Sequence, residues 1–140
     1  MALLTFSRGC SEMAGSRSEK LARLVRVQRQ MERMAEHELS LTMYAQAETD
    51  ATQEALVNAV GSFNPIHAAM SHQYAQRFQR LSARSQMLAG AKGVQERKML
   101  TEKTKADRLA DQAGQAAQAE DRLETDESLL DLLDGSLRRR

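Results

Sequence analysis

Apolar residues recur every three or four positions over much of this chain, which places them on one face of an α-helix. In residues 17–60 this pattern is interrupted at Glu38 and again at Glu48. Its members are Leu24, Val27, Met31, Met34, Leu41 and Ala45. The pattern predicts a first helix over 17–60 whose contact face is this apolar stripe.

A second helical pattern covers residues 65–134 and contains two sets of positions spaced by seven. One set is Tyr74, Leu81, Leu88, Gln95, Glu102, Leu109, Ala116, Leu123 and Leu130. The other is Phe78, Ser85, Lys92, Met99, Ala106, Ala113, Glu120 and Glu127. Together they predict one narrow contact stripe along a single helix. Gly90, Gly93 and Gly114 each cost up to ~1 kcal/mol relative to alanine, so bending or fraying is expected there.

Local signals place the helix ends. Ser16 and Glu19 form a capping box, which predicts that the first helix begins at about Arg17. Gly61 is expected to end it after Val60.

The only proline, Pro65, follows Asn64, a good N-cap, and occupies the first helical position, where its missing N–H costs nothing. A single kinked helix is the alternative. It is less favoured because a residue before proline is pushed out of the α region. The stop at Gly61 and the start at Asn64 are also separate signals, so two helices joined by a turn are favoured.

The expected fold is therefore all-α: a long antiparallel two-helix coiled-coil hairpin with a loose N-terminal leader and a C-terminal amphipathic segment. Its parts are a flexible leader at 1–16, a hairpin at 17–134 (helix 17–60, turn 61–64, helix 65–134) and a basic tail at 135–140.

Folding about residue 63 places residue i opposite about residue 126 minus i. Met31 is then expected near Gln95, and Leu41 near Ser85. In this register residues 110–134 have no partner in the first helix. They either continue the second helix or fold separately.

The charges alternate in blocks although the net charge is only +1. Residues 34–60 carry five acidic and no basic residues, whereas 61–105 carry eight basic and two acidic ones. An antiparallel hairpin brings these two blocks together, the acidic one beside Arg77, Arg80, Arg84 and Lys92, as complementary flanks require.

The composition suits a thin helix pair rather than a compact globule. The chain has five aromatic residues, no tryptophan and 28% charged residues, so little bulky apolar material is available for a core. Many contact positions are Ala, Ser, Gln or charged and bury little apolar area at ~25 cal/mol per Å². The isolated chain is expected to be marginally stable, with a second copy or another protein sharing its contact face.

Catalytic and metal-binding patterns are missing from the sequence. His37, His67 and His72 have no Cys or carboxylate at ligand spacing, so neither a metal site nor a cofactor is expected. No phosphate-binding loop or nucleophile motif is present, and the chain is expected not to be an enzyme.

Two features bear on location. A single cysteine, Cys10, cannot form an internal disulfide. No stretch approaches the roughly 20 apolar residues of a membrane span. A cytoplasmic protein without direct membrane insertion is expected, reaching the inner membrane only through partners.

Two groups of residues are candidate partner-binding sites. Phe63 and Ile66 lie in and just after the turn, and Phe63 fits neither stripe, so it either folds back over the tip or is exposed for a partner. Tyr74 and Phe78 are expected to stabilise the tip as core. The second group is the C-terminal cluster Leu129, Leu130, Leu132 and Leu133, which with Leu137 is expected to cover one side of an amphipathic helix. Docking into a groove is favoured over the alternative, in which these leucines simply end the hairpin's own stripe.

A nucleic-acid-binding role for the basic stretch 77–105 is an alternative. The stretch lacks interleaved aromatic residues for base stacking, and the neighbouring acidic blocks would repel phosphate. A solvated flank of the helix pair is favoured instead.

Two segments resemble the bacterial flagellar export protein FliJ and the YscO-type stalk proteins of type III secretion. They are LARLVRVQRQMERMAEHELS, near the start, and QRFQRLSARSQMLAGAKGVQERKMLTEKTKADRLADQA, in the second helix. The resemblance implies a non-enzymatic stalk or escort that contacts a hexameric export ATPase and a membrane export gate and handles export chaperones. The alternative is an oligomeric coiled-coil scaffold or adaptor that self-associates and has no export role.

Overall fold

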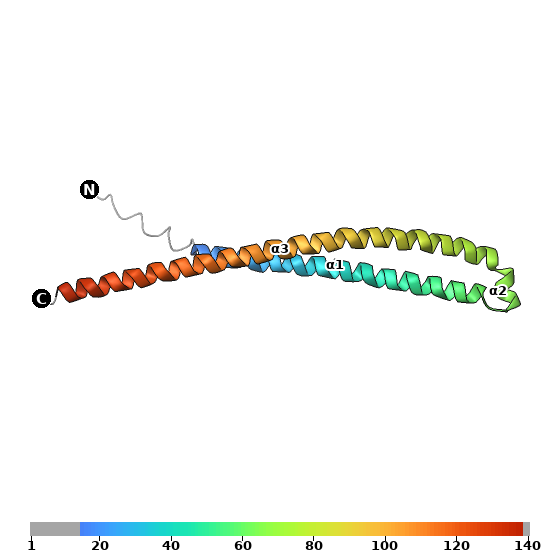
Figure 1. The fold of residues 1–140 in the computed structure, drawn as a ribbon, viewed down its shortest axis with the longest axis horizontal. Coiled ribbons are helices and arrows are strands. Elements are labelled where there is room, and N and C mark those ends of the chain that lie inside the picture. The colour runs from blue at the N-terminus through green and yellow to red at the C-terminus, as the bar shows by residue number, and fades with distance from the viewer. Residues whose placement is uncertain (1–14, 139–140) are drawn as a thin grey trace, which may run out of the picture. The chain divides into compact units, whose positions relative to one another are not determined.

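The computed structural model describes residues 15–138, a range that contains three helices and no strand. α1 spans Arg17–Val60, α2 spans Pro65–Ala69 and α3 spans Ser71–Leu137 (Figure 1). The all-α prediction is confirmed. Most of the expected leader, with Cys10, and the last two arginines of the expected basic tail lie outside the described residues.

The chain divides into two compact units. The tip unit is Met31–Lys103 and contains the end of α1, all of α2 and the start of α3. The tail unit consists of the described residues of Met1–Gln30 and Thr104–Arg140, so it contains the start of α1 and the remainder of α3. In each unit α1 packs against α3.

The capping residue predicted for α1 acts as expected. The Glu19 backbone N–H donates to Ser16 Oγ at 3.2 Å, and the Lys20 N–H donates to the Ser16 carbonyl at 3.1 Å. The first bond satisfies an N–H group that has no backbone partner in the first turn, and the second is the first backbone bond of the helix. α1 therefore begins at Arg17.

The connection at the tip differs from the predicted one. Asn64 caps a helix as expected, its side chain accepting the Ile66 N–H at 3.0 Å, but that helix is α2 and ends after one turn at Ala69. Met70 closes α2 with φ −95° and ψ 6°, and its carbonyl then accepts the Tyr74 N–H at 3.1 Å inside the first turn of α3. The helix predicted over 65–134 is thus two helices, and the second of them continues to Leu137.

The extra turn of helix changes the register of the tip unit. Glu38 Oε2 lies 2.8 Å from Lys98 Nζ, and the Ser85 hydroxyl donates to Asp50 Oδ1 at 3.3 Å. Folding about residue 63 would have put Glu38 opposite residue 88 and Asp50 opposite residue 76, so the predicted register is wrong by about ten residues. The chain enters α3 later in the sequence than predicted, because α2 and Met70 occupy part of the connection. The predicted meeting of acidic α1 with basic α3 is nevertheless present in the Glu38–Lys98 pair.

The contact face of α3 is the predicted one. In the tip unit both sets of positions spaced by seven are buried or half-buried, except Phe78, which is exposed. In the tail unit the same sets stay buried or half-buried as far as Glu120. Gly90, Gly93 and Gly114, where bending or fraying was expected, lie within the uninterrupted helix.

The contact face predicted for α1 is wrong. Leu24, Val27, Met31, Met34 and Leu41 are all exposed, and only Ala45 of the predicted set is half-buried. In the tip unit α1 instead buries or half-buries Glu32, Ala35, Leu39, Thr42, Gln46, Thr49, Gln53 and Leu56. In the tail unit it half-buries Leu21, Val25 and Gln28. These positions keep an unbroken seven-residue spacing, whereas Glu38 and Glu48 interrupt the more apolar stripe. α1 therefore contacts α3 through its continuous stripe rather than through its more apolar one.

The tail unit brings the start of α1 to residues that were expected to lack a partner. Arg29 Nη2 lies 2.7 Å from Asp107 Oδ1, and the Ser18 backbone N–H donates to Glu120 Oε1 at 3.0 Å. The Ser18 hydroxyl donates to the other carboxylate oxygen of Glu120. The prediction that residues 110–134 have no partner in the first helix is therefore wrong as far as Glu120, because the register is shifted. Beyond Glu120 the leucines of α3 are exposed.

Glu120 makes this contact dependent on pH. Hydrogen bonds from the Ser18 hydroxyl and the Ser18 backbone N–H lower the pKa of Glu120 from its ordinary value of 4.5. A carboxyl whose pKa is lowered by folding stabilises the fold above its unfolded pKa, and this stabilisation is lost as the pH falls through the lower, folded value. We expect hydrogen-exchange protection of the Ser18 and Glu19 amides to be full near neutrality and to decline below pH 4.5. Glu120→Gln should remove most of this pH dependence, and an unchanged profile would contradict the assignment.

Candidate functional site

A hollow in the tip unit lies between the last turns of α1 and the first turns of α3. Its volume is about 400 Å³, within the range of sites that hold small ligands or single side chains. Its walls are mainly apolar. The lining residues are Leu56, Val57, Val60, Ser71, Tyr74, Ala75, Phe78 and Gln79. We call this feature the tip groove.

The buried part of the tip groove is Leu56, whose side chain is only 7% exposed, whereas Val57 and Val60 beside it are more than half exposed. These three residues are the apolar positions of the last turns of α1. Phe78 and Tyr74 were both predicted to be core, but Phe78 is exposed at the groove and Tyr74 is only half-buried. The groove offers apolar surface and the polar ends of Ser71 and Gln79, an arrangement suited to binding an apolar side chain of a partner.

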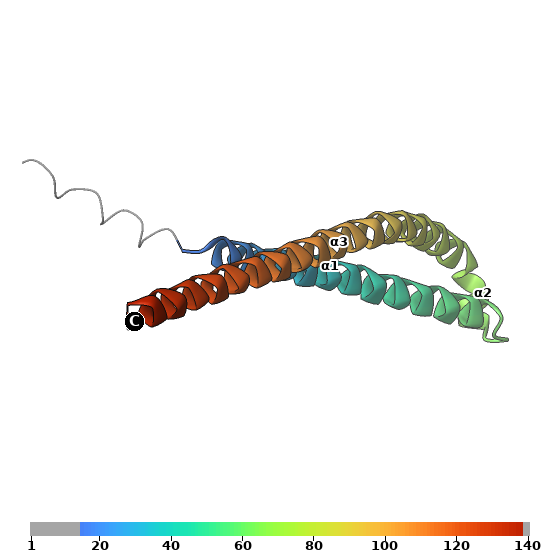
Figure 2. The same ribbon diagram turned by 60° about the vertical axis from the view of Figure 1, so that its left-hand side comes forward.

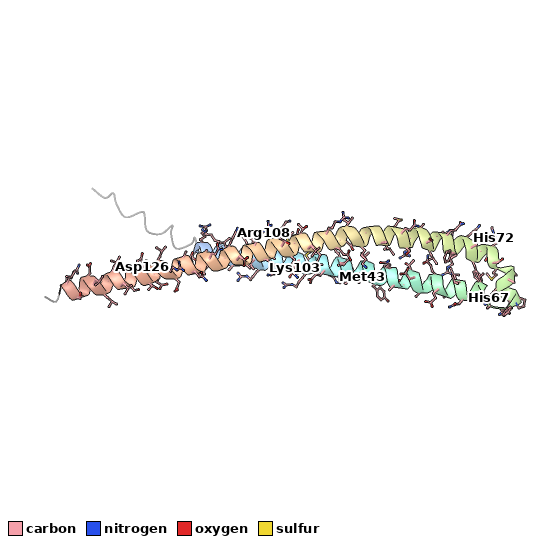
Figure 3. All side chains as sticks on the ribbon, viewed as in Figure 1. Met43, His67, His72, Lys103, Arg108 and Asp126 are labelled. Carbon is pink, nitrogen blue, oxygen red and sulfur yellow. The ribbon has the colours of Figure 1, made fainter. Side chains whose placement is uncertain are left out.

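Tyr74 also ties α2 to α3. Its hydroxyl lies 2.8 Å from His67 Nδ1, and the two rings are tilted by 38° with centroids 5.7 Å apart. His67 is on α2 and His72 is in the first turn of α3 (Figure 3). The His72 ring contacts the side chain of Gln76 at 3.1 Å. The His67–Tyr74 pair therefore holds the short connecting helix against one wall of the groove.

The structure decides between the two alternatives for Phe63. This side chain is fully exposed and does not fold back over the tip. Ile66, three residues later on α2, is also exposed. Two predicted partner-binding residues thus lie on the surface of the short connection, in the same unit as the tip groove.

The other predicted partner-binding residues belong to the tail unit. Leu129, Leu130, Leu132 and Leu133 are all exposed on α3, and that helix continues through them without a break. At 100° per residue these four leucines and Leu137 all fall within an arc of about 160° around the axis of α3. They therefore lie on one side of this helix. The part of that side around Leu130 also includes Leu123 and Leu137.

The α1 wall of the tip groove was not predicted from the sequence. Leu56, Val57 and Val60 were given no role, because the predicted contact stripe was the one that contains Leu41 and Ala45. A usable signal was present, since Leu56 lies seven residues after Thr49, and Thr49 lies seven after Thr42.

Within residues 15–138, no group of three or more His, Cys, Asp and Glu side chains is arranged to hold a metal ion. In the same part of the chain no helix combines the length and the apolar character needed to cross a membrane.

The fold and the groove define a class only: an all-α protein in which two long helices pack against each other and leave apolar side chains on the surface. No protein-family model, curated protein or solved structure matches the chain.

Proposed function

We propose that this chain is a non-enzymatic coiled-coil component of a bacterial type III protein export apparatus, acting as a stalk or escort. In this role it contacts the hexameric export ATPase and the export gate from the cytoplasm. The export assignment rests on the resemblance of the two long helical segments to FliJ and the YscO-type stalk proteins.

The surface of the tip unit supports a partner-binding role. Phe63 is fully exposed on a connection that also exposes Ile66, and the apolar tip groove lies in the same unit. Exposed aromatic side chains and apolar hollows are typical of the anchors and pockets of protein interfaces. Phe63 and Ile66 take no part in the contact between α1 and α3, so their side chains are available to a partner.

A binding experiment with a purified hexameric export ATPase tests the proposal. We expect the chain to be retained by the ring and to stimulate ATP hydrolysis. Phe63→Ser combined with Ile66→Ser should weaken retention by about tenfold or more, since an interface anchor contributes about 1–2 kcal/mol or more. Far-UV circular dichroism should show unchanged helix content, because neither side chain is buried. Met87→Ser, at an exposed apolar residue elsewhere in the tip unit, is the matched control and should bind normally.

Failure to bind or stimulate the ring would overturn the export function. Retention that is insensitive to the Phe63 and Ile66 substitutions would keep the function but remove the tip as its contact site.

A self-associating coiled-coil scaffold is the second candidate function. It is favoured by a specific observation in the tail unit. The contact face of α3 continues beyond the start of α1 as exposed leucines, an arrangement that another helix can cover.

A further inference from the structure

In the tail unit the contact positions of α3 continue past the start of α1. Ala116 is half-buried against α1, and the same seven-residue spacing then gives Leu123, Leu130 and Leu137. These three leucines are between 64% and 70% exposed. α1 cannot cover them, because it begins at Arg17 and its first turn is already bonded to Glu120. In both views of the tail unit α3 runs on beyond the start of α1 (Figures 1 and 2).

The charges around these leucines indicate what kind of helix covers them. Residues 121–134 carry six acidic residues and one basic residue. Asp126, Glu127 and Asp134 lie within about 60° of the leucine face on a helix of 100° per residue. Asp126 is on the exposed part of α3 (Figure 3). Two such segments side by side would place like charges together, so a basic helix suits this face and a second acidic tail does not.

A matching surface is present on α1 in the same unit. Leu24 and Val27 are 52% and 59% exposed, and they share a face with Arg17 and Lys20, while Arg23 flanks it. This face turns away from the chain's own α3, since Leu21, Val25 and Gln28 make that contact. It combines apolar side chains with positive charge, the complement of the leucine face.

We propose that the chain self-associates by placing residues 121–137 of one copy on the Leu24 and Val27 face of α1 in a second copy. The partner surface must come from another molecule, because α3 is one continuous helix and carries its leucine face past the start of its own α1. The lengths agree, since 17 residues of α3 and the 14 residues of α1 in this unit extend over roughly 25 and 21 Å.

A two-fold axis completes the arrangement. Each acidic segment then covers the basic face of the other copy, both apolar faces are buried, and the assembly closes as a dimer. The inference rests on the scaffold function given above and specifies the surfaces through which that function operates.

Charge reversal on the full-length chain tests the proposal by sedimentation velocity. One variant carries Lys20→Glu and Arg23→Glu, and the other carries Asp126→Lys and Glu127→Lys. Each variant alone should bind itself at least about tenfold more weakly than the unmodified chain, because both of its docking contacts oppose like charges. An equimolar mixture should recover a dimer containing one copy of each, since the acidic tail of the first variant meets an unmodified α1 and the basic tail of the second meets an acidic one.

The control is Arg77→Glu with Arg80→Glu, two exposed residues of the tip unit, which should leave the association unchanged. Circular dichroism of every variant establishes that the helices are intact. Leu130→Gln should also weaken the dimer, without altering any charge.

Several results would overturn the proposal. A chain that stays monomeric at micromolar concentration removes both the scaffold function and this interface. A dimer that resists both charge reversals, or a mixture that fails to restore association, keeps the scaffold function and rejects these surfaces. A chain that dimerises only after removal of residues 1–14 would make that segment the occupant of the leucine face.

Discussion

Leu56→Ala should lower the free energy of unfolding of the protein by about 2–3 kcal/mol, as measured by urea denaturation followed by far-UV circular dichroism. Leu-to-Ala substitutions at buried sites cost about 2–5 kcal/mol, through lost burial of apolar surface and the cavity that remains. A value near the lower end is expected here, because Leu56 borders the open tip groove and water can enter the vacated space. The effect is large for this chain, since the only buried apolar residues in the part that the structure describes are Ala35, Leu56 and Ala106.

Val57→Ala is the matched control for this prediction. Val57 is the next residue along α1 and lines the same groove, but more than half of its surface is exposed. Its substitution should change the unfolding free energy by about 0.5 kcal/mol or less, as is usual for surface positions. Equal costs for the two substitutions would show that Leu56 does not anchor the helix pair at the tip.

The helices and the contact face of α3 were predicted well from the sequence, because both depend on local chemistry. Ser16 caps α1 and Asn64 caps α2 through side-chain hydrogen bonds that need no tertiary context. The seven-residue spacing from Tyr74 to Ala116 had no competing stripe, so a single face was available. Both predictions follow from properties of one helix considered alone.

The α1 contact face and the register depend on how two helices meet, and the sequence pattern was ambiguous there. α1 carries two stripes about 100° apart: one more apolar and interrupted, the other more polar and continuous. Glu32 and Thr49 are buried on the continuous stripe. A contact face chosen by hydrophobicity alone would not include these two polar residues. The register failed because the break at Met70 has no glycine or proline to signal it.

The same causes explain which parts of the candidate sites could be predicted from the sequence. Phe63 and Ile66 were predictable because each is a large apolar residue beside helix-stop and helix-start signals, where no stripe can cover it. The tip groove was not predictable, because its α1 wall appears only when the continuous stripe faces α3. The leucines beyond Glu120 are exposed because α1, which begins at Arg17, does not reach them, so the shifted register determined where the exposed segment starts.

Ala106→Arg should separate the start of α1 from α3 in the tail unit. Ala106 is 0% exposed, so the helices approach each other too closely there for a long side chain. Overpacking alone costs about 1–3 kcal/mol, and bringing a guanidinium into this contact adds a desolvation cost. We expect the amides of residues 21–30 to lose hydrogen-exchange protection by at least tenfold, while those of residues 40–55 serve as the internal reference.

Ala117→Arg makes the same substitution at an exposed position of the same helix, and it should leave that protection within about twofold of the unmodified chain. The comparison separates the loss of a close helix contact from any general effect of adding a positive charge to α3. If both variants retain protection, Ala106 is not a site of close approach. If both lose it equally, the added charge acts without regard to burial. A loss confined to Ala106→Arg would show that small residues set the spacing of the two helices, which explains how a contact face with so few large apolar side chains holds them together.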